Sequence, residues 1–280
     1  MQIVFLLCGL VAVAFVFLIS AYLILSGLPA IRQIGVQEFL LGTEWASTAQ
    51  EPEFGILPLI LTSGFGTAGA IALGVPVGFL TAVCLAKAVP PRPAAAIRFA
   101  VNLLAGIPSV VYGLLGMTVL VPWVRRTFSL SAGDSLFAAI IVLAVMILPS
   151  VISVSEAALS AVPKEYEEGS LALGATRAET WFRVSVPAAG SGIAAAVVLG
   201  VGRAIGEAMA ILMVAGNVAN LPSLFESVRF LTTGIAIEMN YSTVGSLQRM
   251  ALYSIGLVLF LFIMLINILL SLVIGPKKED

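Results

Sequence analysis

Charged residues are scarce in this chain, and histidine is absent. Only 10% of the 280 residues are charged, whereas a soluble domain carries about 25%. Without histidine the chain cannot build a His-dependent catalytic triad, a zincin site or a histidine-ligated haem. Aspartate occurs only at positions 134 and 280, which disfavours an intramembrane pair of catalytic aspartates. We therefore expect no enzyme, no catalytic residue and no metal site.

The positions of lysine and cysteine and the low net charge argue against further classes of protein function. None of the four lysines stands in a Gly-Lys-Ser/Thr phosphate loop, so we expect no nucleotide site and no cofactor in this chain. The net charge of −1 provides no basic field for nucleic acid. Cys8 and Cys84 both lie inside apolar runs, where they serve most simply as small hydrophobic residues rather than as a disulfide.

Apolar residues make up 60% of the chain, which indicates an all-α integral membrane protein. A helix needs about 20 apolar residues to cross the hydrocarbon core. We predict one transmembrane domain over residues 1–280, with six spans near residues 3–25, 56–86, 99–121, 136–159, 191–218 and 247–274. The first span lacks a basic leader, so a membrane anchor is favoured over a cleaved signal peptide.

The distribution of basic residues predicts the orientation of these spans. With the N-terminus in the cytoplasm, the basic residues inside are Lys87, Arg92, Arg98, Lys164, Arg177, Arg183, Lys277 and Lys278. Those outside are Arg32, Arg125, Arg126, Arg229 and Arg249. Because cytoplasmic loops carry the excess of Lys and Arg, both termini and the loop over 160–190 are expected inside.

The loop over residues 160–190 contains, at 167–187, the longest polar interval between two strongly apolar stretches. Pro163 is suited to open a helix, because its missing N–H would be unpaired there anyway. The pattern predicts a short helix over 164–173 that stops at a left-handed Gly174. A Thr-x-x-Glu capping box at Thr176 then starts a second helix, which a proline interrupts before the chain turns apolar again.

The spacing inside this loop resembles the EAA loop of bacterial ABC importer permeases. Glu168, Gly174 and Pro187 fall at the anchor positions of that pattern, while Gly169 and Ser170 replace its two alanines. The resemblance implies that this segment is a coupling loop through which the chain contacts a cytoplasmic ATPase. The alternative is an ordinary cytoplasmic loop with two surface helices.

The fifth span contains Arg203 and Glu207, which a continuous helix would bring onto one face as an i, i+4 pair. Each ionisable residue deep in a membrane costs about 2.5–3.5 kcal/mol on insertion scales. The pair either fixes helix packing or forms an anion site in the substrate path. The arginine fork can bind two oxygens of an anion. An ionised glutamate can accept a hydrogen bond from phosphate, which carries a proton near neutral pH, but it would repel sulfate.

A four-residue pattern occurs twice in the third and fourth spans, as Ile107-Pro108-Ser109-Val110 and Leu148-Pro149-Ser150-Val151. A proline inside a helix frees a carbonyl from its partner and bends the helix. We interpret both prolines as packing kinks, with the lining of a pathway as the alternative.

The stretch from Gly202 to Asn217, GRAIGEAMAILMVAGN, looks like the signature of phosphate-specific ABC importer permeases of the PstC-like type. Residues 54–58, 105–113 and 172–176 agree with the same family. The resemblance implies the type I ABC importer permease fold of the binding-protein-dependent transport inner-membrane components. It also implies that Arg203 and Glu207 act in phosphate passage.

The function that this resemblance implies is half of the translocation path of an ATP-driven phosphate importer in the bacterial inner membrane. The expected partners are a sister PstA-like permease, two copies of a cytoplasmic ATPase and a phosphate-binding protein. The alternatives are a permease for another oxyanion such as molybdate or tungstate, and a stand-alone secondary anion transporter or channel. An intramembrane enzyme is disfavoured by the missing histidine and paired aspartate.

Overall fold

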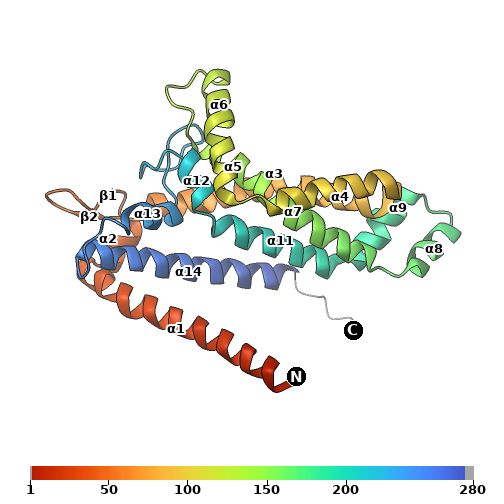
Figure 1. The fold of residues 1–280 in the computed structure, drawn as a ribbon, viewed down its shortest axis with the longest axis horizontal. Coiled ribbons are helices and arrows are strands. Elements are labelled where there is room, and N and C mark those ends of the chain that lie inside the picture. The colour runs from red at the N-terminus through yellow and green to blue at the C-terminus, as the bar shows by residue number, and fades with distance from the viewer. Residues whose placement is uncertain (1, 275–280) are drawn as a thin grey trace. The chain divides into compact units, whose positions relative to one another are not determined.

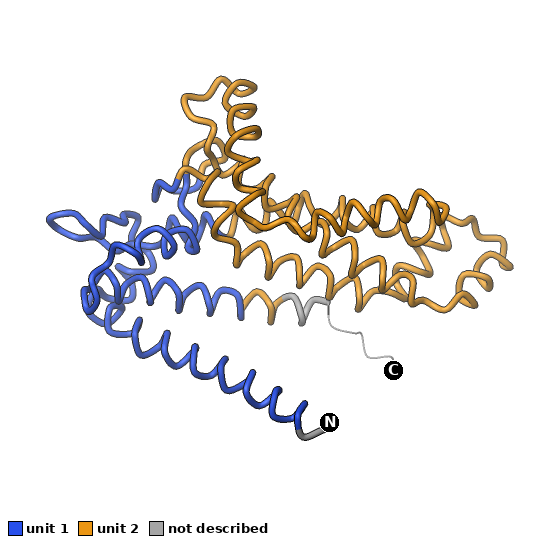
Figure 2. Tube along the Cα trace, viewed as in Figure 1, with its two compact units in different colours: residues 1–63, 217–222, 228–264 blue, residues 64–216, 223–227, 265–280 orange. Residues whose placement is uncertain are grey.

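The computed structural model describes residues 2–274, and the side chains of residues 4–269. Lys277 and Lys278, which entered the orientation argument, lie outside the described residues. Helices account for most of the ribbon in Figure 1. The chain divides into two compact units (Figure 2), of which the first holds residues 1–63, 217–222 and 228–264, and the second holds residues 64–216, 223–227 and 265–280.

The first unit contains both chain-terminal helices and a small hairpin. Its elements are α1 (Gln2–Ile34), α2 (Val36–Leu41), the antiparallel strands β1 (Trp45–Ala46) and β2 (Glu53–Phe54), the first turns of α3 (Leu57–Val83), α13 (Leu231–Glu238) and most of α14 (Leu247–Ile274). The helices over 2–34 and 247–274 include the predicted first and sixth spans.

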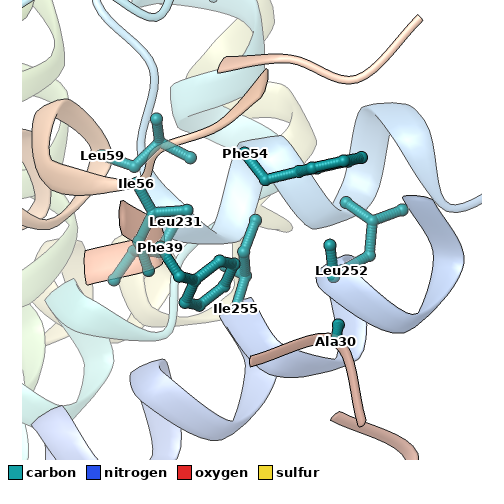
Figure 3. Packing of buried hydrophobic residues seen from close by; sticks show 9 residues of the cluster. Ala30, Phe39, Phe54, Ile56, Leu59, Leu231, Leu252 and Ile255 are labelled. Atoms are coloured by element: carbon teal, nitrogen blue, oxygen red, sulfur yellow. The ribbon is translucent and has the colours of Figure 1, made fainter. Parts of the chain in front are cut away.

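A buried apolar cluster holds this unit together. Figure 3 shows Phe39 of α2, Phe54 of β2, Ile56 and Leu231 gathered with Ile255 of α14, each at most 5% exposed. Burying a side chain of this size contributes about 1.5–3 kcal/mol. The cluster therefore joins segments that lie about two hundred residues apart along the chain.

Polar side chains of the first unit converge on one carboxylate, Glu238 at the end of α13. Oε1 of Glu238 accepts hydrogen bonds from Trp45 Nε1 and Arg229 Nη1, both at 2.7 Å. Its Oε2 accepts from Ser47 Oγ at 2.7 Å and from Gln248 Nε2 at 3.3 Å. A carboxylate paired and hydrogen-bonded in this way offsets its desolvation, so this cluster fixes the hairpin to α13 and α14.

The second unit contains the rest of α3 and the segments that follow it. In chain order these are η1 (Cys84–Ala88), α4 (Pro91–Gly106), α5 (Ser109–Leu115), η2 (Gly116–Leu120), α6 (Val121–Thr127), α7 (Leu136–Ser160), α8 (Lys164–Ala172), α9 (Arg177–Thr180), η3 (Trp181–Ser185), α10 (Val186–Ala188), α11 (Gly190–Ile205) and α12 (Met209–Val214). The segments labelled η are short π-helices, one residue wider per turn than an α-helix.

Helix α7 is the centre of the second unit. It packs against α4, α11 and α12. On α3, an added Cβ at Gly74 would lie 2.7 Å from Ile147 Cδ1, and one at Gly78 would lie 2.9 Å from Val151 Cγ1. These two glycines therefore let α3 and α7 approach closely, as small residues do between membrane helices.

Within residues 2–274, four helices are long and apolar enough to cross a membrane, or six segments if each of two bent helix pairs forms one span. The four are Val4–Ile34, Leu57–Ala88, Leu136–Ser160 and Leu247–Leu269. The first bent pair, Pro91–Gly106 with Ser109–Thr127, turns by 96°, and the second, Arg177–Ala188 with Gly190–Ile205, turns by 73°.

Two of the predicted spans are therefore not continuous helices. The span expected over 99–121 breaks at Ile107 and Pro108, both extended, and its first helix already begins at Pro91, where a basic loop was expected. The span expected over 191–218 ends at Ile205, and a separate short helix covers Met209–Val214. Proline in the first break and Gly206 in the second weaken the helix locally.

Candidate functional site

Arg203 lies on the last turn of α11 and points at α7. Its Nη1 donates a hydrogen bond to Ser150 Oγ at 3.3 Å, and both residues are half-buried. Ser150 follows Pro149 inside α7. The serine of the repeated proline pattern thus contacts the arginine that the sequence marked as a substrate-path residue.

Glu207 does not share a helix face with Arg203, so the predicted i, i+4 arrangement is wrong. Helix α11 ends at Ile205 with Gly206 as its C-cap, and Glu207 lies in the turn beyond it. Its Oε1 accepts a hydrogen bond from the backbone N–H of Ala210 at 2.9 Å. The carboxylate thereby pairs one of the free N–H groups at the start of α12. This capping hydrogen bond favours a break after α11 over its continuation through Glu207.

The loop over residues 160–190 has the local structure that the sequence predicts. Pro163 is the N-cap of α8, which runs over Lys164–Ala172, and Gly174 adopts a left-handed φ of +88°. The capping box at the start of α9 is complete, because Thr176 Oγ1 accepts from Glu179 N at 3.3 Å and Glu179 Oε2 accepts from Thr176 N at 3.0 Å. We call residues 163–189 the elbow.

The prediction that Pro187 interrupts the second helix of the elbow is wrong, because Pro187 lies inside α10 (Val186–Ala188). The helical run continues from α9 through η3 and α10 to Ala188, and the sharp bend follows it. Just before the proline, the N–H of Val186 bonds to the carbonyl of Trp181, five residues back. This wider π-turn accommodates the proline, which has no N–H to donate.

An ion pair that the sequence did not reveal ties the elbow to the end of α3. Lys87 Nζ in η1 contacts Glu167 Oε1 in α8, and Ser185 Oγ in η3 donates to the same oxygen at 2.9 Å. Burial alone would raise the pKa of Glu167, but the hydrogen bonds from Lys87 and Ser185 outweigh it and lower that pKa. The contribution of this ion pair to stability is therefore present above the ordinary carboxyl range and lost as pH falls through the lowered pKa.

The neighbouring Glu168 is exposed. Leu173, at the tip of the elbow beside Gly174, is 92% exposed. Of the elbow residues named from the sequence, Glu168 and Gly174 thus lie on the surface, where a partner can reach them. The scarcity of lysine is the one sequence signal that could have drawn attention to Lys87.

The described residues contain no obvious metal centre. Within residues 2–274, no group of three His, Cys, Asp or Glu side chains gathers as a metal ion would require.

Residues 74–275 match the family described as "Binding-protein-dependent transport system inner membrane component". The chain belongs to this family. It is 42% identical to the "Probable ABC transporter permease protein YqgH" of Bacillus subtilis, over 94% of this chain and 88% of that protein. It is 35% identical to the "Phosphate transport system permease protein PstC" of Haemophilus influenzae, over 92% of this chain and 86% of that protein.

The fold agrees with this membership. A bacterial alginate ABC transporter matches with a TM-score of 0.62 over 97% of this chain and 92% of the other, at 18% identity. The protein therefore has the type I ABC importer permease fold, and it is a multi-pass membrane subunit rather than an enzyme. Family membership implies a partner ATPase and a substrate-binding protein.

Proposed function

We propose that this permease subunit imports inorganic phosphate and forms one half of the path across the bacterial inner membrane. Several relatives at 31–35% identity are named phosphate transport system permease protein PstC. The YqgH relative is named without a substrate, so the anion is the point that needs a test. Residues 1–280 act as one permease domain in this proposal, with both termini in the cytoplasm.

One observation carries the choice of an anion as substrate. Arg203 holds a guanidinium in the apolar fifth span, half-buried, and its fork donates to a neutral hydroxyl at 3.3 Å. A neutral acceptor offsets the cost of a buried cation less well than an anion does. An arriving oxyanion can exchange with the hydroxyl and accept two parallel N–H bonds from the fork.

Glu207 is the proposed source of discrimination between anions. It follows Arg203 by four residues, across the break between α11 and α12. An ionised carboxylate there accepts a hydrogen bond from protonated phosphate and repels a fully ionised anion such as sulfate. Binding at this site is expected to be weak, because an ion held too tightly cannot leave.

The elbow is the proposed coupling element. Glu168 is exposed and Leu173 and Gly174 form its tip, so a cytoplasmic ATPase can bind there. Lys87 and Ser185 fix Glu167 to the end of α3 and to η3, which lets the elbow move as one body with the spans. Pro187 lies just before the 73° bend that joins this body to α11. The complete transporter would add a sister PstA-like permease, a second ATPase copy and a phosphate-binding protein.

The decisive experiment is uptake of labelled phosphate by vesicles that contain the complex of this chain with its partners. We expect ATP-dependent phosphate uptake, no uptake with this chain alone, and weak competition by sulfate or molybdate. Arg203→Ala should abolish uptake while the complex still assembles, and Arg125→Ala, which removes an exposed arginine from α6, is the matched control. Normal uptake by Arg203→Ala, or preferred uptake of another oxyanion, would refute the proposal.

The coupling role is tested separately at Gly174. Its φ of +88° is strained for a β-branched residue. Gly174→Val should lower both uptake and the phosphate-dependent part of ATP hydrolysis, whereas Gly169→Val, in open space within α8, should affect both less. Unchanged transport by Gly174→Val would show that the elbow is not the coupling element.

A further inference from the structure

A polar cavity lies in the second unit, and neither Arg203 nor Ser150 lines it. Its volume is about 400 Å³, and it opens between α4 and α7. Its polar lining residues are Arg98, Asn102, Ser153, Glu156 and Ser160. Neither the family resemblance nor the proposed anion site uses any of them.

Arg98 and Glu156 form an ion pair at the wall of this cavity. Arg98 Nε lies 2.5 Å from Glu156 Oε1, and Arg98 Nη2 donates to the carbonyl of Leu85 at 3.5 Å. The arginine side chain is nonetheless 45% exposed, while the glutamate is 14% exposed. A guanidinium has five N–H donors, so these two contacts leave donors for a ligand in the cavity.

The position of this ion pair argues that the cavity is wet. Glu156 lies on α7, which is long and apolar enough to cross a membrane by itself. Arg98 lies on α4, the first helix of the bent pair that can form another span. Charged groups in such helices face the bundle interior or a water-filled cavity, because hydrocarbon does not solvate them. We therefore expect the exposed side of Arg98 to face water rather than lipid tails.

Polar residues of α7 lie in series between the candidate anion site and this cavity. Ser150, which contacts Arg203, precedes Ser153 by three residues and Glu156 by six. Residues three and four apart on a helix are neighbours on one face, and six residues span about 9 Å of helix axis. This series ends at Ser160, where α7 leads into the elbow.

We propose that the cavity walled by Arg98 and Glu156 is a second oxyanion site, on the exit side of the route that begins at Arg203. The proposal rests on the proposed function, because its ligand is the transported anion, of the tetrahedral phosphate type. Arg98 binds anion oxygens, Glu156 accepts a hydrogen bond from a protonated oxyanion, and Asn102, Ser153 and Ser160 donate neutral hydrogen bonds. Several weak sites in series let an ion enter and leave.

The test uses the chemical reactivity of a cysteine placed in the cavity, which needs no transport. Ser153→Cys is introduced with Cys8→Ser and Cys84→Ser, and the complete complex in zwitterionic detergent is treated with negatively and positively charged methanethiosulfonate reagents. We expect the negative reagent to react at least about tenfold faster than the positive one, because the field of Arg98 concentrates anions. Millimolar inorganic phosphate should slow the reaction.

Arg98→Gln in this background should abolish both the preference for the negative reagent and the protection by phosphate. Arg92→Gln, which removes an exposed arginine from the first turn of α4, should abolish neither. Ser160→Cys reports on the same cavity if Ser153→Cys does not assemble. Equal reaction rates for the two reagents, or an unchanged preference in Arg98→Gln, would show a purely structural ion pair and overturn the proposal.

Two further arms separate the possible ligands. If molybdate or sulfate protects the cysteine and phosphate does not, the oxyanion site stands while the proposed phosphate function fails. If phosphatidylglycerol protects it and no inorganic oxyanion does, the cavity binds lipid head groups and the proposal is overturned. In vesicles, Arg98→Gln should lower the maximal rate of uptake about tenfold with little change in KM. The reason is that the anion reaches this site only after it has entered the route at Arg203.

Discussion

The two copies of the proline pattern have nearly identical sequences and opposite structures. Ile107-Pro108-Ser109-Val110 ends α4 and opens a bend of 96° before α5. Leu148-Pro149-Ser150-Val151 lies inside α7, which continues as one helix from Leu136 to Ser160. The expectation that both prolines are packing kinks is therefore wrong for the first copy, where the helix stops altogether.

The surroundings explain the difference. Gly106, just before the first copy, has open space around it, and Ile107 adopts an extended backbone with φ −72° and ψ +126°. The corresponding residue before the second copy is Ile147, which is fully buried and packs against Gly74 of α3. A proline inside a helix costs about 3 kcal/mol. The dense packing around α7 offsets this cost, so α7 stays helical. Helix α4 is less buried, so nothing offsets the cost there and the helix ends.

The largest effect is expected when a glycine is placed directly before the second copy, where Gly106 stands before the first. Ile147→Gly removes a fully buried side chain and adds a flexible residue before the proline, at a cost of about 3–5 kcal/mol. The melting temperature of the purified complex should fall steeply. Ile107→Gly, at the half-buried residue directly before the first proline, should cost less than about 1 kcal/mol. Equal losses in the two variants would mean that packing does not distinguish the two copies.

The next effect comes from the other side of the same contact. Gly74→Val would put a branched side chain against Ile147 Cδ1 and within 2.9 Å of the Ala144 carbonyl oxygen. Overpacking of this kind costs about 1–3 kcal/mol, which a thermal melt of the complex would detect. Gly106→Val meets no atom within 4 Å and should cost clearly less. A harmless Gly74→Val would argue that α3 does not hold α7 straight.

The serines of the two copies should differ in transport. Ser150 accepts a hydrogen bond from Arg203, whereas Ser109 opens α5. Ser150→Ala should lower the initial rate of phosphate uptake about fivefold, because a lost hydrogen bond is worth about 1 kcal/mol. Ser109→Ala should change the rate less than twofold. The prediction fails if both alanine variants transport alike.

The smallest effect is expected at the proline of the bent copy. Pro108→Ala restores an N–H group, but Gly106 and the exposed α4 remain. We expect the angle between α4 and α6 to change little and stability to shift by less than about 1 kcal/mol. Distances between spin labels on α4 and α6 measure this, and a straightened helix would assign the bend to the proline alone.

The elbow was the most predictable part of the candidate site. Its two short helices, the left-handed Gly174 and the capping box at Thr176 all depend on residues within a few positions of one another. The ion pair of Lys87 with Glu167 could not be predicted, because 80 residues separate its members. Glu207 was misplaced for a different reason, since its local pattern fits both a continuing helix and a cap.

The sequence by itself determined that this chain lies in a membrane, that it belongs with the ABC importer permeases, and how its elbow is built. These features follow from hydrophobic length, from motif spacing and from turn chemistry, all of which act over short stretches of chain. Only the tertiary structure decided which proline breaks a helix, what Arg203 contacts, and that Arg98 and Glu156 share a cavity. Those outcomes depend on burial and on distant partners, which local propensity cannot encode.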